Sequence, residues 1–227
     1  MPAIASQRQT DPPPCALDWF GSEAGLGLLT AEASAVQRIL AGCPALPWAW
    51  LGAPAASPPP VVGRGLLLKR DGHRWGGAVR CGLPLPLASE TFGAVLLQHV
   101  LDDGIDADSL LGECARVLAP GGTLWLAALN PWTPYRARWA RSGLHARDPG
   151  RWQAALRRAG FVADSISMQW LGPHWRVGHG DAGVGATDRL RAGLALTVSK
   201  RVWAAIPPAR LHRLHWQAGR SPLDGLR

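Results

Sequence analysis

The sequence has no long hydrophobic run. None of its 227 residues lies in an uninterrupted apolar stretch of about 20 residues, the length that crosses a bilayer. The first residues, MPAIASQRQTDPPP, also lack the charged start and apolar core of a signal peptide. We therefore expect no membrane span and a cytoplasmic location.

Metal-binding and disulfide patterns are absent as well. The 4 cysteines are far apart, with no Cys-x-x-Cys pair and no histidine at zinc-ligand spacing. His212 and His215 have no cysteine or carboxylate partner nearby. These absences argue against a disulfide framework and a metal site, and predict reduced thiols that fill core space.

Acidic residues are fewer than basic ones. The chain has 16 Asp and Glu against 24 Lys and Arg, which gives a net charge of +8, mostly from arginine. This excess favours an anionic partner such as nucleic acid, an acidic protein or a membrane surface. Arg-rich, Lys-poor usage also results from a high-GC coding sequence, and no recognisable nucleic-acid-binding signature accompanies the charge.

Length and composition favour a single domain with loose ends. A chain of 227 residues with 47% hydrophobic content can bury one sizeable core. Residues 1–14 end in three prolines and carry no apolar periodicity, so we expect a disordered lead-in. We assign the domain to residues 15–206 and a basic C-terminal tail, a candidate contact for an anionic partner, to residues 207–227.

Strand and helix patterns alternate along the domain. The N-cap residue Thr30 predicts a helix that ends at Gly42, and Asp148 predicts one that ends at Gly160. Apolar runs and periodicity predict strands over residues 45–51, 66–68, 92–97, 123–129, 161–166 and 194–199, and a helix over residues 110–118 that Pro-Gly-Gly ends. Such alternation is typical of an α/β fold with a mostly parallel sheet covered by helices.

Three short motifs fall in order within residues 83–131. They are Leu85-Pro86, Thr91-Phe92-Gly93 and the run from Arg116 to Gly122, RVLAPGG. In this order and spacing they resemble the type 11 group of class I S-adenosylmethionine-dependent methyltransferases. The resemblance implies a Rossmann-like three-layer sandwich with about seven strands and S-adenosylmethionine as cofactor. The segment Asn130-Pro131-Trp132 is similar to the corresponding segment in a proteobacterial branch of the family.

The glycine motif of that family is degenerate here. Family members bind the cofactor at a Gly-x-Gly turn after the first strand, because only glycine lets backbone and ligand approach closely. The matching segment keeps only Gly52, followed by Ala53 and Pro54. The acidic residue expected at the end of the second strand would be Asp71, if that strand ends late. A second match, GHGDAG from Gly178, follows no clear strand and is interpreted as a loop.

Ligands of this fold bind beyond the carboxyl ends of the strands. The resemblance therefore implies one crevice, where cofactor-binding residues are predicted at the following positions: Gly52, Ala53, Asp71, Cys81, Gly82, Leu83, Gln98 and His99. His99 is a candidate general base because histidine titrates near neutrality, although it would equally cap the strand or face solvent. Asn130 would either bind substrate or hold the Asn-Pro turn.

Two functions remain open. The first is a methyltransferase with an unknown methyl acceptor, for which proximity and in-line orientation supply most of the catalysis. The second is a relative that kept the fold, lost the cofactor and acts as a binding or regulatory partner. The 12 tryptophans would mostly pack in the core or in interfaces, and stacking on adenine is the alternative.

Overall fold

The computed structural model describes residues 15–60, 63–173 and 187–201. The predicted lead-in, the basic tail, the GHGDAG segment, His212 and His215 lie outside these ranges, so the expectations about them stay predictions. Within the described ranges, no helix is both long and apolar enough to span a membrane.

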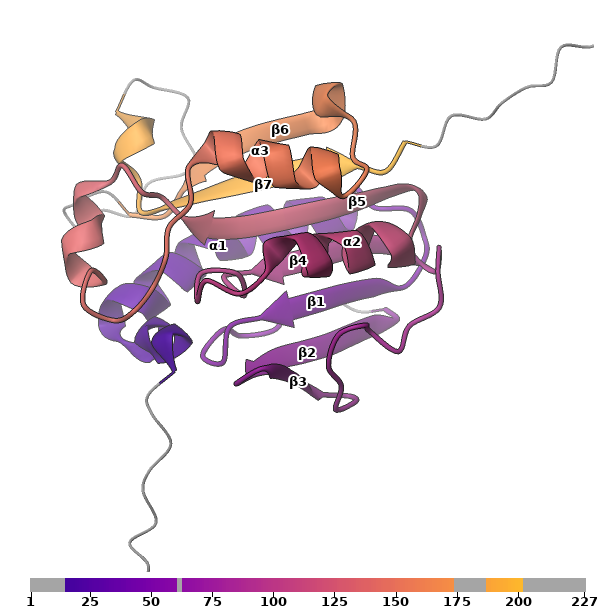
Figure 1. Ribbon diagram of the computed structural model, residues 1–227, viewed down its shortest axis with the longest axis horizontal. Coiled ribbons are helices and arrows are strands. Elements are labelled where there is room, and N and C mark those ends of the chain that lie inside the picture. The colour runs from indigo at the N-terminus through magenta and orange to yellow at the C-terminus, as the bar shows by residue number, and fades with distance from the viewer. Residues whose placement is uncertain (1–14, 61–62, 174–186, 202–227) are drawn as a thin grey trace, which may run out of the picture.

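Seven strands form one sheet (Figure 1). They are β1 (Trp48–Gly52), β2 (Gly65–Asp71), β3 (Arg74–Gly77), β4 (Phe92–Gln98), β5 (Leu118–Leu129), β6 (Ile166–Leu171) and β7 (Gly193–Ser199). Their spatial order is β3-β2-β1-β4-β5-β7-β6. The pairs β1–β2, β1–β4 and β4–β5 are parallel, whereas β2–β3, β5–β7 and β6–β7 are antiparallel.

The sheet is therefore mixed, and the prediction of a mostly parallel sheet was only partly right. Strand β3 is antiparallel because only Gly72 and His73 separate it from β2, and a two-residue connection allows no crossover. Gly72 has a φ of +55°, which suits the tight turn. The sequence pattern did not predict β3, since Arg74-Trp-Gly-Gly is short and rich in glycine.

Helices cover both faces of the sheet, as a three-layer sandwich requires (Figure 1). Helix α1 (Glu23–Ala41) lies on one face, and α2 (Ala107–Val117) and α3 (Pro149–Arg158) lie on the other. Short 3-10 turns are formed by the following residues: Ala16–Gly21, Pro134–Arg138, Ala163–Ser165 and Asp188–Leu190.

The core consists of two apolar clusters, one on each side of the sheet. Strand β4 is buried along its whole length, as its continuous apolar run predicted. Its side chains alternate, so Leu96 packs toward α1 while Val95 and Leu97 pack toward α2 and α3.

The N-cap of helix α1 lies eight residues before the predicted one. It is Ser22, whose side chain accepts a hydrogen bond from the Gly25 amide at 3.2 Å. Thr30 lies inside the helix, where its hydroxyl donates to the Leu26 carbonyl. Gly25 and Gly27 give the first turns the composition of a loop, which explains the wrong boundary.

The other helix boundaries agree better with the sequence. Asp148 caps α3 by accepting from the Gly150 amide at 2.7 Å, and Gly160 follows the helix with a φ of +96°. Helix α2 ends at Val117, so Pro-Gly-Gly lies within β5. The strand predicted over residues 161–166 was wrong, because Ala163–Ser165 is a 3-10 turn and β6 begins at Ile166.

The crossover between β1 and β2 has an unusual form. Parallel neighbours are generally joined through a helix, yet the described residues between Gly52 and Gly65 contain none. Instead this connection runs through Pro58, Pro59 and Pro60. The part of the α1 face beside β1 is consequently bordered by a loop.

Candidate functional site

The predicted crevice lies where β1 and β4 end side by side. Gly52 pairs with Gln98 on one side and with Lys69 of β2 on the other. The backbone amide of Ala53 also donates to the Gln98 carbonyl at 3.0 Å. The structure thus brings together Gly52, Ala53 and Gln98, as the sequence predicted.

Gly52 is covered by a neighbouring side chain of its own strand. The indole ring of Trp50 lies against it, and a Cβ placed on Gly52 would be 2.2 Å from a ring carbon. Trp50 is fully buried, and its Nε1 donates to the Gln98 amide oxygen at 3.1 Å. The missing side chain at Gly52 therefore makes room for tryptophan.

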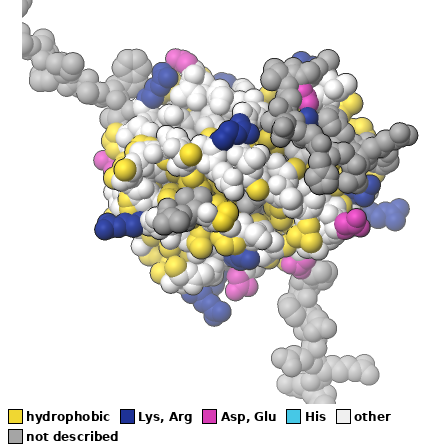
Figure 2. Space-filling view, turned by 180° about the vertical axis from the view of Figure 1, so that it is seen from behind, with side chains coloured by type: hydrophobic (Ala, Val, Ile, Leu, Met, Phe, Trp, Pro, Cys, Tyr) yellow, Lys and Arg dark blue, Asp and Glu magenta, His cyan; other side chains and the backbone are white. Residues whose placement is uncertain are grey.

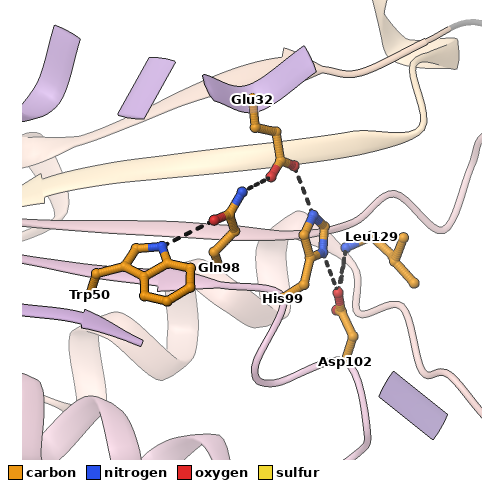
Figure 3. Close-up of polar contacts among 6 residues, drawn as sticks. All are labelled: Glu32, Trp50, Gln98, His99, Asp102 and Leu129. Atoms are coloured by element: carbon orange, nitrogen blue, oxygen red, sulfur yellow. Dashed lines mark hydrogen bonds and ion pairs between the residues drawn. The ribbon is translucent and has the colours of Figure 1, made fainter. Parts of the chain in front are cut away.

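A buried chain of polar groups continues from Gln98 (Figure 3). The Gln98 amide donates to one carboxylate oxygen of Glu32 at 2.9 Å, and the other oxygen lies 2.8 Å from Nε2 of His99. Nδ1 of His99 lies 2.7 Å from a carboxylate oxygen of Asp102. The Leu129 amide also donates to Asp102, at 3.2 Å. These contacts link α1 to the ends of β4 and β5.

His99 is held between two carboxylates. Burial by itself would lower its pKa, but Glu32 and Asp102 on its two ring nitrogens raise the pKa to about 10. At neutral pH the ring is thus an imidazolium that donates from both nitrogens. Burial raises the pKa of the Asp102 carboxyl, while the hydrogen bond from His99 acts in the opposite direction.

The surroundings of His99 do not suit a general base. Its side chain is 0% exposed, the Phe20 ring packs 4.5 Å from it, and both nitrogens are engaged. Nor does the ring face solvent, which was one of the alternative expectations. His99 instead joins α1, β4 and the segment after β4, with a backbone φ of +55°.

Sequence reasoning missed Glu32. It is a fully buried acidic residue on the face of α1 that also buries Leu28, Leu29 and Val36. A single carboxylate among apolar helix positions was the available signal, because a buried charge requires a partner.

The outer candidates make no hydrogen bond to this cluster. Asp71 is exposed at the end of β2, and it is its neighbour Arg70 that is buried, 5.0 Å from the Trp75 ring and 3.4 Å from an Asp103 oxygen. Cys81 pairs with Trp75 beyond the edge strand β3. Four strand spacings, about 19 Å, therefore separate Cys81 from Gln98. Gly82 and the exposed Leu83 follow Cys81 at this edge.

Asn130 is buried after β5 and holds two chain segments together. Its amide nitrogen donates to the carbonyls of Arg189 and Arg191 at 2.8 and 2.7 Å, and its oxygen accepts from the Trp132 amide at 3.0 Å. These bonds match the turn role, one of the two that the sequence left open.

The resemblance implies that S-adenosylmethionine binds at the Gly52 turn, but the residues at this turn do not fit it. The Trp50 ring fills the space above the glycine, and the polar groups of Gln98 and His99 already bond within the protein. Among the described residues, no group of three or more His, Cys, Asp or Glu side chains is arranged to hold a metal ion.

A groove of about 220 Å³ opens beside the covered glycine. One wall is α1, the other is the β1–β2 crossover, and Gln98 lies between them. The lining residues are Leu26, Leu29, Thr30, Ala33, Val36, Ala55, Ser57, Pro58, Pro59, Pro60 and Gln98. We call it the α1 groove. Hydrophobic side chains gather on this face of the molecule (Figure 2).

The strand order and layers define the class of protein, a Rossmann-like fold shared with S-adenosylmethionine-dependent methyltransferases. An enzyme of this kind from Thermotoga maritima superposes with a TM-score of 0.52 at 14% identity, over 78% of this chain and 91% of its own. Another from Archaeoglobus fulgidus gives 0.50 at 11% identity, over 81% and 97%. These similarities support the fold. The comparison with curated proteins found no match.

The family model described as "Methyltransferase domain" matches residues 76–126, which run from β3 into β5. The matched segment overlaps residues 83–131, where the motifs predicted a similarity to the type 11 group of class I methyltransferases.

Proposed function

We propose that the protein is an S-adenosylmethionine-dependent methyltransferase with an unidentified acceptor. The observation that carries the proposal is the family match over residues 76–126, because this segment contains β4 and its carboxyl end, where ligands of this fold bind. Methyl transfer depends chiefly on proximity and orientation. The burial of His99 beside Gln98 is therefore compatible with it.

The proposal requires the Trp50 ring to leave Gly52. Such a movement breaks the bond between Trp50 and Gln98 and exposes a buried indole. A lost hydrogen bond and an exposed aromatic side chain together cost about 3 kcal/mol. That cost lowers the apparent affinity about 100-fold relative to a protein whose crevice is already open.

A second candidate function is a non-catalytic relative that acts as a binding partner. The observation in its favour is the filled crevice, in which Trp50, Gln98 and Glu32 bond to one another. A closed polar chain of this kind stabilises the fold without any ligand.

Calorimetric titration of the full chain with S-adenosylmethionine and S-adenosylhomocysteine tests the proposal. The wild type is compared with Trp50→Leu and with the matched control Trp152→Leu, which shortens another fully buried tryptophan on the opposite face. We expect weak binding by the wild type, at least tenfold tighter binding by Trp50→Leu and no change in the control. Trp50→Phe serves as a milder variant if the leucine variant unfolds.

Absence of binding heat in the wild type and in both Trp50 variants would reject the methyltransferase proposal and favour the non-catalytic relative. Equal tightening in Trp50→Leu and Trp152→Leu would show that Trp50 does not close the cofactor site.

A further inference from the structure

We propose that the α1 groove is a binding site for an uncharged, apolar ligand of one or two fused rings. This inference goes beyond the proposed function, since it rests on the groove alone and holds whether or not the crevice at Gly52 admits a cofactor.

The groove exists because no helix of the described residues packs beside this part of α1. Leu26, Leu29, Ala33 and Val36 follow helical spacing on one side of α1 and line the groove together. Leu26 remains 46% exposed, which is unusual for leucine on the inner side of a helix. The β1–β2 crossover contains no helix among its described residues, so within the described part of the chain this apolar strip stays open.

The opposite wall is stiff. Pro58, Pro59 and Pro60 line it with rings whose φ angles are fixed. Few conformations of this wall are lost when a ligand binds, so the entropic cost of binding is small.

None of the described residues that line the groove has a charged side chain, although the whole chain has a net charge of +8. Its polar side chains are Thr30, Ser57 and Gln98, all neutral. A charged ligand would lose hydration in the groove without gaining a counter-ion, whereas a neutral ligand loses little. The groove therefore selects against charged ligands.

The volume sets the size of the ligand. A cavity of about 150 Å³ accommodates a benzene molecule, so a groove of about 220 Å³ has room for a single ring with substituents or for a bicyclic ring.

The base of the groove is fixed at the carboxyl end of β4. Gln98 lies there with its amide oxygen bonded to Trp50 and its amide nitrogen bonded to Glu32. Because both partners are fully buried, the amide cannot swing into the groove without breaking a bond. A ligand is thus placed beside the strand ends, where this fold binds its ligands.

The test uses the uncharged bicyclic fluorescent probe 1-aminonaphthalene, whose emission changes in apolar surroundings. The full-length wild type is compared with Ala33→Trp, which fills the groove, and with the matched control Ala31→Trp. Both alanines are exposed on α1, but only Ala33 lines the groove. We expect saturable one-to-one binding, at least tenfold weaker in Ala33→Trp and unchanged in Ala31→Trp.

A smaller substitution and a charged competitor complete the test. Ala33→Leu fills less of the groove, so its affinity should fall between those of the wild type and Ala33→Trp. The anionic probe 1-aminonaphthalene-5-sulfonate, which has the same two fused rings, should not displace the neutral probe. Equal probe affinity in Ala33→Trp and wild type, or displacement by the anionic probe, would overturn the inference. Neither outcome depends on S-adenosylmethionine, so failure here is distinguishable from failure of the proposed function.

Discussion

The Trp50 ring occupies the space that a side chain at residue 52 would need. This contact predicts the effect on stability of adding one methyl group at residue 52. In Gly52→Ala the new Cβ would lie 2.2 Å from the Trp50 ring, so the ring has to move. Overpacking of this kind costs about 1–3 kcal/mol of the free energy of unfolding. Urea denaturation of Gly52→Ala and wild type measures the loss.

The Trp50→Leu background provides the control for this prediction. With the indole absent, the same alanine should cost less than about 1 kcal/mol, and the two substitutions should be non-additive. Additive losses would mean that the ring does not decide the identity of residue 52.

The end of β4 was the part of the candidate site most accessible to sequence analysis. Gln98 and His99 follow a continuous apolar run, and such a run shows where a buried strand stops. Their partner Glu32 was not predicted, because hydrogen bonds between α1 and β4 join residues 66 and 67 positions apart. Periodicity within one helix contains no information about such a pair.

At the start of α1, two side chains of similar chemistry should behave differently. Ser22→Ala removes the side chain that caps the helix and should lower the free energy of unfolding by about 1 kcal/mol. Thr30→Ala should be neutral or slightly stabilising, since Thr30 is exposed within the helix and alanine has the higher helix propensity. Thermal unfolding of both variants measures the difference, and a larger loss in Thr30→Ala would place the N-cap where the sequence predicted it.

Elements with strong local signals were predicted well. Strand β4 has an uninterrupted apolar run, and α3 has an aspartate cap with proline in its first turn. Strand β6 was misplaced because its residues are mostly exposed along an edge, which removes the apolar run that marks a buried strand. Its position is set by antiparallel pairing with β7.

The stability of the folded protein should depend on pH through His99. Its pKa is raised from 6.5 to about 10 by folding, so the folded state keeps a proton that the unfolded state releases between these values. The stabilisation is fully present below pH 6.5 and is lost as the pH rises toward 10. Between pH 7 and 8.5 the free energy of unfolding should fall by at most about 1.4 kcal/mol per pH unit.

Glu32→Gln isolates this effect. The variant removes the negative charge that helps to raise the His99 pKa, so its unfolding free energy should depend less on pH over the same interval. Glu23→Gln makes the same chemical change at an exposed position of α1 and should keep the wild-type slope. Identical slopes in all three proteins, measured by urea denaturation at several pH values, would contradict the assignment.

The class of the fold was predictable because β4, α2 and β5 carry both the apolar pattern and the family motifs. The mixed strand directions were not predictable, because they depend on how the chain reverses at the two edges of the sheet. Two residues between β2 and β3 force a reversal, and β7 lies between β5 and β6 although it follows both along the chain.

The sheet also sets the order in which contacts can form during folding. Strands β2 and β3 meet through a tight turn, so they can pair early, whereas Trp48 of β1 has to find Ala94 of β4 across a long intervening loop. Closing that loop costs chain entropy before any packing compensates for it, and non-local parallel pairing is the slow kind. The pairing of the central strands, which support the candidate site, therefore limits the folding rate. Until these strands have paired, the partly formed sheet has exposed edges, and the chain is then most prone to aggregation.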